Sequence, residues 1–563
     1  MLKFLTRAGK AIEADDVVNA ESAEAFWRVL PKDDPIVAQR AVCDALLSIR
    51  GPRGPEIDRL RALLALERRS QSLLESLLAE YASPSGLAPE HDSRLRQPIV
   101  ELSRAFAQAH EYFFRHVRDH PSDAEWMGLA PSLLVHLYRH REVELLLALY
   151  RYETLSRGRW KDINGAYEFA LANDFARRPV AVDHRDDKTN ATITLEHAFI
   201  RILLLQLTGG GQFLPFDIAS ARQWIGGWSE LLSLVPANAD DGMDAPSIGF
   251  RVDLSSSHGL KRPSSLHAIE VRQLRLDTSP IATATEQALA SARSTAAENG
   301  SEAMVRARRL ALLARLKILF AAERPRIKRR GERVRVESMS VQAIIGGLPS
   351  IGRTLRNESR RPVEAETAQP PYVDEITITD VPRYTDASRT VARDVAAGFL
   401  QVVGVDVLQP QWQVHDRSES GCLIRGQTLD TQQSLPGSLM ALRDKDAPWT
   451  VAVVRRLSKV GGALVELGVE HIGRNPQRVV MLSGGAGNEK RDKFVALYLP
   501  ESDAYPQIPI KTLIVPAHEY APARALTMVS TASETAIRLK TPIEHQRDFV
   551  WTAFELVGRE RRR

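Results

Sequence analysis

The stretch Thr450-Val-Ala-Val-Val454 is soon followed by Ala463-Leu-Val-Glu-Leu-Gly-Val469, and both are short, rich in β-branched residues and bounded by turns. Such runs are typical of β-strands. Further runs of this kind follow residue 323, namely Arg333–Val336, Glu375–Thr379, Phe494–Leu499, Thr512–Val515, Ala525–Val529 and Ala536–Leu539. This density predicts an all-β region, in which the last strands either complete one barrel or sandwich or form a second.

The first half of the chain has a different pattern. Over residues 1–180 apolar residues recur at steps of three and four, which predicts helices almost throughout. One such stripe consists of Leu102, Phe106, Ala109, Phe113 and Val117. The segment Pro121-Ser-Asp-Ala-Glu125 predicts the end of one helix and the start of the next. Because no fixed repeat period is visible, we expect a helical bundle or array rather than a named repeat fold.

Residues 181–322 give a mixed signal. Helical patterns over Thr194–Leu207, Ala219–Leu234 and Ser301–Phe320 surround two alternating runs, Phe250–Leu254 and Ile269–Leu276, that are typical of strands. We therefore expect a mixed α/β segment here.

The composition limits the classes of function. A chain of 563 residues with 44% hydrophobic and 26% charged residues predicts several folded domains. The net charge of +5 does not require a nucleic-acid partner, so we expect neither DNA nor RNA. Two cysteines, Cys43 and Cys422, exclude a disulfide scaffold and suit a reducing compartment. No export signal is visible and the apolar run Ala198–Leu207 is too short to cross a bilayer, so we expect a cytoplasmic protein without a transmembrane segment.

A basic segment lies where the helical pattern gives way to strands. The stretch Arg324-Pro-Arg-Ile-Lys-Arg-Arg-Gly-Glu-Arg-Val-Arg335 contains seven basic residues and one acidic residue. The planar guanidinium of arginine holds phosphate oxygens at two points and stacks on bases, so this segment predicts an anion site. The alternative is a solvated basic linker or a nonspecific polyanion patch.

A second motif lies in His415-Asp-Arg-Ser-Glu-Ser-Gly421. On an extended strand Asp416 and Ser418 point to the same side. The carboxylate is able to accept the N–H donors of a guanine edge, the hydroxyl is able to bind a phosphate or base, and Gly421 allows a close approach of the backbone. The alternative is an ordinary polar turn with an Asx hydrogen bond.

Together the two motifs resemble those of PilZ domains, the small β-barrels that bind the bacterial second messenger cyclic di-GMP. PilZ domains carry an Arg-x-x-x-Arg loop before the first strand and an Asp/Asn-x-Ser-x-x-Gly segment on a following strand. The residues that match are Arg326 with Arg330, Arg329 with Arg333, and the trio Asp416, Ser418 and Gly421. The resemblance covers roughly residues 324–475, whereas the helical half resembles no family that we recognise.

The resemblance implies roles for these residues. The arginines would neutralise phosphates and stack on guanines, Asp416 and Ser418 would read guanine, and Gly421 would permit the approach. The sequence departs from the family in one respect, because Arg330 and Asp416 are 416 − 330 = 86 positions apart. Loop closure costs only about 0.6 kcal/mol per doubling of length, so an insertion that folds aside is tolerable. A rival pair, Arg356 and Arg360, has the same spacing and leaves the choice of arginines open.

Other patterns carry less information. The segment Ser483–Lys490 lacks the full phosphate-loop motif and is better explained as a hairpin loop, and Thr208–Gln212 as a helix stop. His136 and His140 share a helical face, but no third ligand is evident, so we expect no metal site. Further histidines close in sequence to this pair are His110, His116 and His120. No nucleophile, base and orienting group occur together, so we expect no enzyme and no catalytic residues.

These inferences combine into one hypothesis. We expect a helical region over 1–180, a mixed segment over 181–322, a PilZ-like barrel with an insertion over 323–475, and further strands with a basic tail over 476–563. The protein would bind cyclic di-GMP without another cofactor and pass the signal to a protein partner through its helical half, in control of motility, adhesion or polysaccharide production. The alternative is a scaffold whose PilZ-like domain no longer binds nucleotide.

Overall fold

The structure is a computed structural model of the 563-residue chain. The residues that it describes are 4–5, 11–12, 14–51, 54–83, 92–181, 192–237, 249–262, 272–294, 300–322, 334–359, 408–427, 431–445, 447–483, 492–500, 511–529 and 534–557. The chain divides into two compact units. The helical unit consists of Met1–Arg329 and Arg456–Gly462, and the barrel unit of Arg330–Arg455 and Ala463–Arg563.

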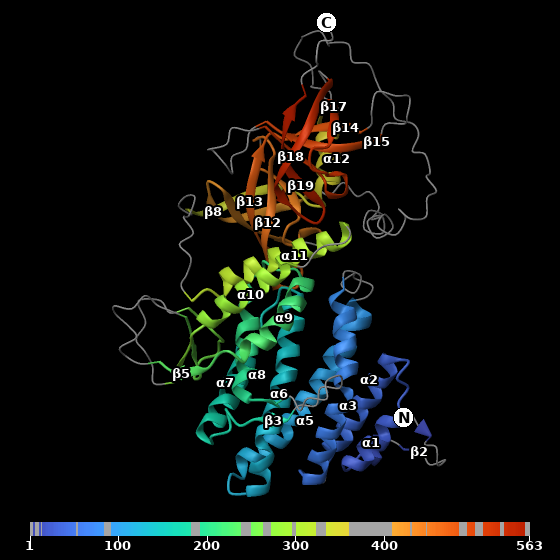
Figure 1. The fold of residues 1–563 in the computed structure, drawn as a ribbon, viewed down its shortest axis with the longest axis vertical. Helices are drawn as coiled ribbons and strands as arrows, with labels where there is room; N and C mark the ends of the chain where they lie inside the picture. Colours follow the sequence, from blue (N-terminus) through green and yellow to red (C-terminus); the bar gives the residue numbers. More distant parts are fainter. Residues whose placement is uncertain are drawn as a thin grey trace. The chain divides into compact units, whose positions relative to one another are not determined.

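The helical unit is built mainly from helices (Figure 1). Their buried side chains form one large apolar core. Its helices are α1 (Ala20–Val29), α2 (Pro35–Ile49), α3 (Ile57–Ala82), α5 (Gln97–Asp119), α6 (Ala124–Tyr150), α7 (Arg157–Ala172), α8 (Leu195–Leu207), α9 (Pro215–Ser229), α10 (Ser279–Ser294) and α11 (Gly300–Leu319). Among the described residues, no helix has the length and apolar character needed to cross a membrane.

The patterns of the helical half are confirmed. The predicted stripe from Leu102 to Val117 is the buried face of α5, which packs against α6. The predicted break lies between these helices, where the side chain of Asp123 accepts hydrogen bonds from the first backbone N–H groups of α6. Such a cap satisfies donors that have no partner within the helix. The run Ala198–Leu207 lies within α8 and is largely buried, and α8 ends where the Thr208–Gln212 stop was predicted.

The mixed segment contains a small antiparallel sheet. Strands β5 (Leu234–Pro236), β6 (Phe250–Asp253) and β7 (Gln273–Leu276) form this sheet in the order β5-β7-β6. Both predicted strand runs are therefore found. Two-stranded ladders pair β1 (Phe4–Leu5) with β2 (Ala11–Ile12), and β3 (Val180–Ala181) with β4 (Thr192–Ile193).

The barrel unit contains two closed six-stranded antiparallel barrels. The first has the order β10-β13-β12-β11-β8-β9 and is formed by β8 (Val334–Ile344), β9 (Leu408–Ser418), β10 (Gly421–Gln427), β11 (Leu439–Arg443), β12 (Thr450–Gly461) and β13 (Leu464–Arg474). The second has the order β14-β15-β16-β19-β18-β17 and is formed by β14 (Gln477–Ser483), β15 (Asp492–Leu499), β16 (Thr512–Pro516), β17 (Ala525–Val529), β18 (Glu534–His545) and β19 (Phe549–Leu556). The last strands therefore form a second barrel rather than completing the first.

The two barrels share an apolar core. Trp449 and Ile472 of the first barrel pack in one cluster with Phe549 and Trp551 of the second. Helix α12 (Gly347–Ser359) contributes its buried Ile351 to the same cluster. The predicted strand Glu375–Thr379 lies outside the described residues.

Candidate functional site

Strand pairing in the first barrel places the end of the basic segment beside the Asp416 and Ser418 motif. Strand β8 begins at Val334, within the last two residues of the basic segment, and runs antiparallel to β9 with Val334 opposite Arg417 and Arg335 opposite Asp416. Arg335 and Asp416, which are far apart in sequence, are therefore neighbours at this ladder. The side chains of Arg326, Arg329, Arg330 and Arg333 lie outside the described residues.

Asp416 and Ser418 are among the last residues of β9, next to the tight connection to β10. Both side chains are half-buried, whereas Arg417 between them is exposed, as expected for residues on alternate sides of a strand. Asp416 Oδ1 accepts a hydrogen bond from the Leu423 backbone N–H at 3.2 Å. The Ser418 hydroxyl donates to the Gly421 carbonyl at 3.1 Å. Both side chains therefore also stabilise their own hairpin.

Gly421 is required by the barrel itself. A Cβ atom at this position would lie 2.1 Å from the carbonyl oxygen of Val469 and 3.2 Å from Cα of Glu470, both on β13. Gly421 pairs with Glu470 in the β10–β13 ladder. Glycine at this position thus allows the backbone of β13 to approach β10 closely.

The rival arginine pair has a different setting. Arg356 is exposed on α12, a helix that packs against strands of both barrels. Arg360 lies outside the described residues. Arg356 is thus part of a helix, whereas the basic segment leads directly into the strand that pairs with β9.

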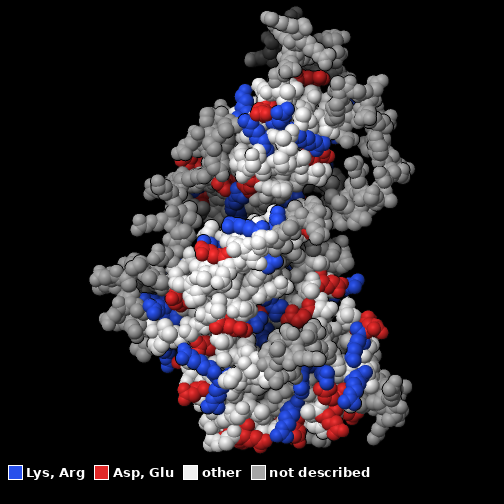
Figure 2. All heavy atoms as spheres, in the orientation of Figure 1, with Lys and Arg blue, Asp and Glu red and all other residues white. Residues whose placement is uncertain are grey.

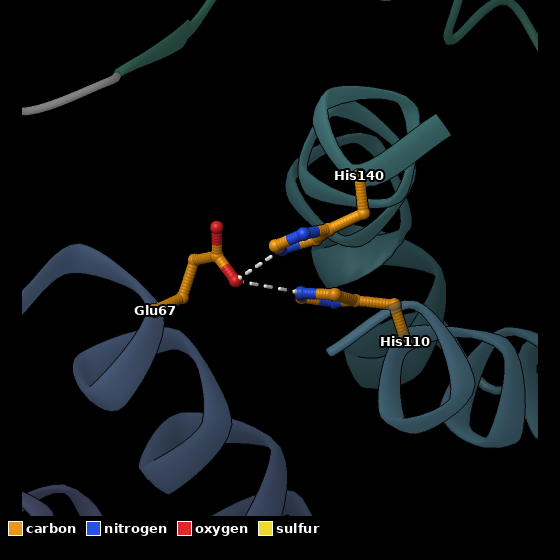
Figure 3. Close-up of side chains that lie close together, drawn as sticks. All are labelled: Glu67, His110 and His140. Carbon is orange, nitrogen blue, oxygen red and sulfur yellow. Dashed lines mark hydrogen bonds and ion pairs between the residues drawn. The ribbon is translucent and has the colours of Figure 1, made fainter. Parts of the chain in front are cut away.

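The helical unit holds a second cluster of chemically active side chains, built on three helices. Glu67 of α3 faces His110 of α5 and His140 of α6, as Figure 3 shows. The Glu67 Oε2 atom is 2.8 Å from His140 Nε2 and 3.4 Å from His110 Nε2. On the other side of the carboxylate, His136 Nδ1 is 3.8 Å from Glu67 Oε1.

Burial sets the protonation of this cluster. Glu67, His110 and His140 are at most 4% exposed. Burial lowers the pKa of His136 to about 3 and also lowers the pKa of His110. Burial raises the pKa of Glu67, but the neighbouring histidines outweigh this effect and hold the pKa well below its usual range. At neutral pH the cluster therefore combines an ionised carboxylate with neutral His110 and His136 imidazoles.

A cavity of about 80 Å³ adjoins the cluster, and Glu67 and His140 are part of its wall. Arg222 donates to Glu142 at 2.6 Å and to Glu75 at 2.8 Å, so its charge is matched. Arg139 also lines this cavity, and its guanidinium interacts electrostatically with the carboxylates of Glu67, Glu142 and Glu75.

The sequence pointed to the His136 and His140 pair but not to Glu67. A signal was present, because Glu67 interrupts the apolar stripe of α3 that runs through Leu60, Leu63 and Leu74. A carboxylate on a buried helical face requires partners, since an unpaired buried charge is costly. The partners are on other helices and cannot be identified from the spacing along α3.

Comparison with known proteins concerns the helical unit. Residues 21–238 match the N-terminal domain of the cyclic-di-GMP receptor FimW. The match begins in α1 and ends just after β5, so it includes Glu67, His110 and His140. The helical half, for which the sequence had suggested no family, is thus similar to that domain over these residues. Both barrels lie outside the match. No curated protein and no solved structure matches the chain.

Proposed function

We propose that this protein is a cytoplasmic receptor for cyclic di-GMP that binds the nucleotide at its first barrel and passes the signal to a protein partner through its helical unit. Two independent parts of the chain support this proposal. Residues 21–238 match a domain named for a cyclic-di-GMP receptor. The first barrel, which lies outside that match, carries the paired motifs that resemble PilZ domains.

The pairing of β8 with β9 carries the proposal. A dinucleotide of guanylate needs cations for its phosphates and acceptors for its base N–H groups within one site. Val334 and Arg335, the last two residues of the basic segment, lie opposite Arg417 and Asp416, which supports a site shared by the two motifs. The long insertion between the two motifs is compatible with this pairing, since β8 and β9 are adjacent strands.

Each side chain retains capacity for a ligand. A carboxylate accepts several hydrogen bonds, so the bond from Leu423 N–H to Asp416 leaves further lone pairs for a guanine edge. The Ser418 oxygen, which donates to Gly421, still accepts. Guanidinium groups of Arg326, Arg329, Arg330 or Arg333 would supply the phosphate contacts and stack on the bases.

The helical unit is the proposed output surface, with motility, adhesion or polysaccharide production as the process controlled. On the face shown in Figure 2, acidic and basic side chains of the described residues are interspersed. Such a surface suits a protein partner better than a polyanion. The second candidate is a scaffold without nucleotide binding, and it is favoured by the bonds that Asp416 and Ser418 make within their own hairpin.

Titration calorimetry of the full chain with cyclic di-GMP tests the proposal. We expect saturable binding in the micromolar range or tighter. Arg330→Ala should weaken binding about tenfold or more, because a charge-assisted hydrogen bond contributes about 1.5–3 kcal/mol. Asp416→Asn, which keeps an acceptor for Leu423 N–H, should also weaken it, whereas Arg356→Ala serves as the matched control and should bind like the wild type.

Several outcomes would contradict this assignment. Absence of saturable uptake by the folded wild type, with partner binding retained, would favour the scaffold. Loss of binding in Arg356→Ala but not in Arg330→Ala would move the phosphate contacts to α12. Chromatography of the nucleotide after incubation should show it unchanged, and turnover would indicate an enzyme.

A further inference from the structure

The buried cluster of the helical unit has the composition of a metal centre. We infer that Glu67, His110 and His140 bind one divalent transition-metal ion, with zinc as the ion that fits best. The ligand atoms of these three residues lie within 4.8 Å of one another. The proposed ion is independent of cyclic di-GMP binding, which we place on the barrel unit.

The distances suit a small ion at the centre of the three donors. Zinc binds imidazole nitrogen and carboxylate oxygen at about 2.0–2.2 Å, so neighbouring ligand atoms of a tetrahedral site lie about 3.3 Å apart. The separation of 3.4 Å between His110 Nε2 and Glu67 Oε2 has this value. The separation of 2.8 Å between His140 Nε2 and the same oxygen requires a small outward movement of one ring.

The protein holds these rings in place before any ion binds. The His140 ring is stacked on Phe106 with centroids 5.0 Å apart and an angle of 6° between the planes. Its other nitrogen, Nδ1, lies 3.5 Å from the Ser103 hydroxyl, which can accept a hydrogen bond from the ring N–H when Nε2 binds a metal. Partners of this kind orient metal-bound histidines in known sites. The ligands also come from three different helices, α3, α5 and α6, so the ion would cross-link the bundle.

His136 provides a second, independent observation. Its side chain is 9% exposed, and its Nδ1 atom has no hydrogen-bond partner among the described residues. This atom faces the cluster, 3.8 Å from Glu67 Oε1. A buried nitrogen without a partner is costly, and its position beside the carboxylate makes it a candidate for an additional ligand.

The donor set selects the class of ion. Imidazole nitrogens suit zinc, copper, iron and nickel, whereas calcium and magnesium prefer sites made of oxygen. Neutral imidazoles and an ionised carboxylate are the protonation states that bind metal. The adjoining cavity, which Glu67 and His140 line, leaves room for a water or hydroxide at a further coordination position.

The competing explanation is a metal-free cluster, in which the two Nε2–H groups simply donate to the Glu67 carboxylate. The two explanations differ in stoichiometric metal uptake. The full chain would be treated with a chelator, desalted, loaded with Zn²⁺ or Co²⁺, and its metal content measured by mass spectrometry after gel filtration. We expect about one equivalent per chain, and for Co²⁺ the visible absorption of a site with fewer than six ligands.

Variants locate the ion. Loss of an outer-shell partner weakens metal binding about 10–100-fold. His140→Ala and Glu67→Gln each remove a ligand and should weaken metal binding by more than this. His518→Ala is the matched control, because His518 lies in the barrel unit with a side chain that is 77% exposed, and it should bind metal like the wild type. Circular dichroism would establish that each variant is folded.

A measurement on the wild type alone covers the case in which the variants do not fold. An ion that binds only the folded state raises the melting temperature, so removal of metal should lower the Tm and Zn²⁺ should restore it. The proposal is overturned if the loaded wild type retains no metal and its Tm does not respond to Zn²⁺. It is equally overturned if folded His140→Ala and Glu67→Gln bind metal with the affinity of the wild type.

Discussion

Arg455 of β12 donates two hydrogen bonds to Glu544 of β18, at 2.5 and 2.6 Å, so that one ion pair joins the two barrels. The same guanidinium binds Glu470 of β13 at 2.7 Å. Burial raises the pKa of Glu544, but Arg455 outweighs this effect and lowers it. The carboxylate is thus ionised because the first barrel supplies its counter-charge.

Arg455→Met should therefore destabilise the protein. It leaves the Glu544 carboxylate, only 18% exposed, without its main partner. We expect a loss of about 1–3 kcal/mol, below the about 3–5 kcal/mol of fully buried pairs, because Arg455 is itself 36% exposed. Urea unfolding followed by circular dichroism measures the change. Arg538→Met is the control, because Arg538 and its partner Glu555 are 50% and 45% exposed, and it should cost less than about 1 kcal/mol.

Gly421→Ala should disturb the first barrel. The added Cβ would meet the Val469 carbonyl oxygen at 2.1 Å, so β10 and β13 would have to separate locally. We expect a lower Tm and weaker cyclic di-GMP binding together. Gly461→Ala provides the comparison, since a Cβ at Gly461 meets no atom within 4 Å. Equal Tm values for the two variants would contradict this reasoning.

Much of the fold was predictable because it depends on local periodicity. The stripe of α5 and the strands around Val451 and Leu467 are strongly patterned, and a helix and two strands are found there as predicted. Helix α10 was not predicted. Its sequence is rich in alanine, serine and threonine, and its buried residues are only Ile281, Thr285, Leu289 and Ala292. Such a face has little hydrophobic contrast, and packing against α11 rather than the local pattern stabilises it.

Acid should destabilise the helical unit through Glu142. Burial raises the pKa of this carboxyl, but Arg201 and Arg222 outweigh it and lower the pKa to about 2. Since the pKa of Glu142 is lower in the folded state than in the unfolded state, its ion pairs stabilise the protein above about pH 4.5. That stabilisation is lost as the pH falls from about 4.5 to about 2. Glu142→Gln should be less stable at pH 7, and its stability should fall less steeply across this interval. The free energy of unfolding in urea, measured at several pH values, checks this. Parallel curves of this free energy against pH for the wild type and Glu142→Gln would refute the prediction.

Cys43 should react slowly in the folded protein. Burial raises the pKa of its thiol to about 12, so almost no thiolate is present at pH 8. Alkylation by iodoacetamide should be at least about a hundredfold slower in the native protein than in urea, because the thiolate is the nucleophile. Peptide mass spectrometry follows the site directly. Similar rates in both conditions would mean that Cys43 is accessible and ionisable.

The candidate sites differ in how far the sequence could reveal them. The Asp416, Ser418 and Gly421 motif is contiguous, so spacing alone identified it. The choice between the basic segment and Arg356 depends on which segment leads into a strand beside β9, and strand register is a property of the folded barrel. The Glu67 cluster brings three helices together, and a single buried carboxylate in the α3 stripe does not reveal partners on α5 and α6.

Because the two barrels share an apolar core, the first barrel should not be produced without the second. A shortened protein that ends at Arg474 would keep every strand of the first barrel but would expose Trp449, Ile472 and Ile351 to water. Exposed apolar patches of this kind promote aggregation. Aggregation of such a fragment would lower the apparent nucleotide binding, so the measurement would not give the true affinity. The two barrels should be produced together, and we expect them to melt in a single transition.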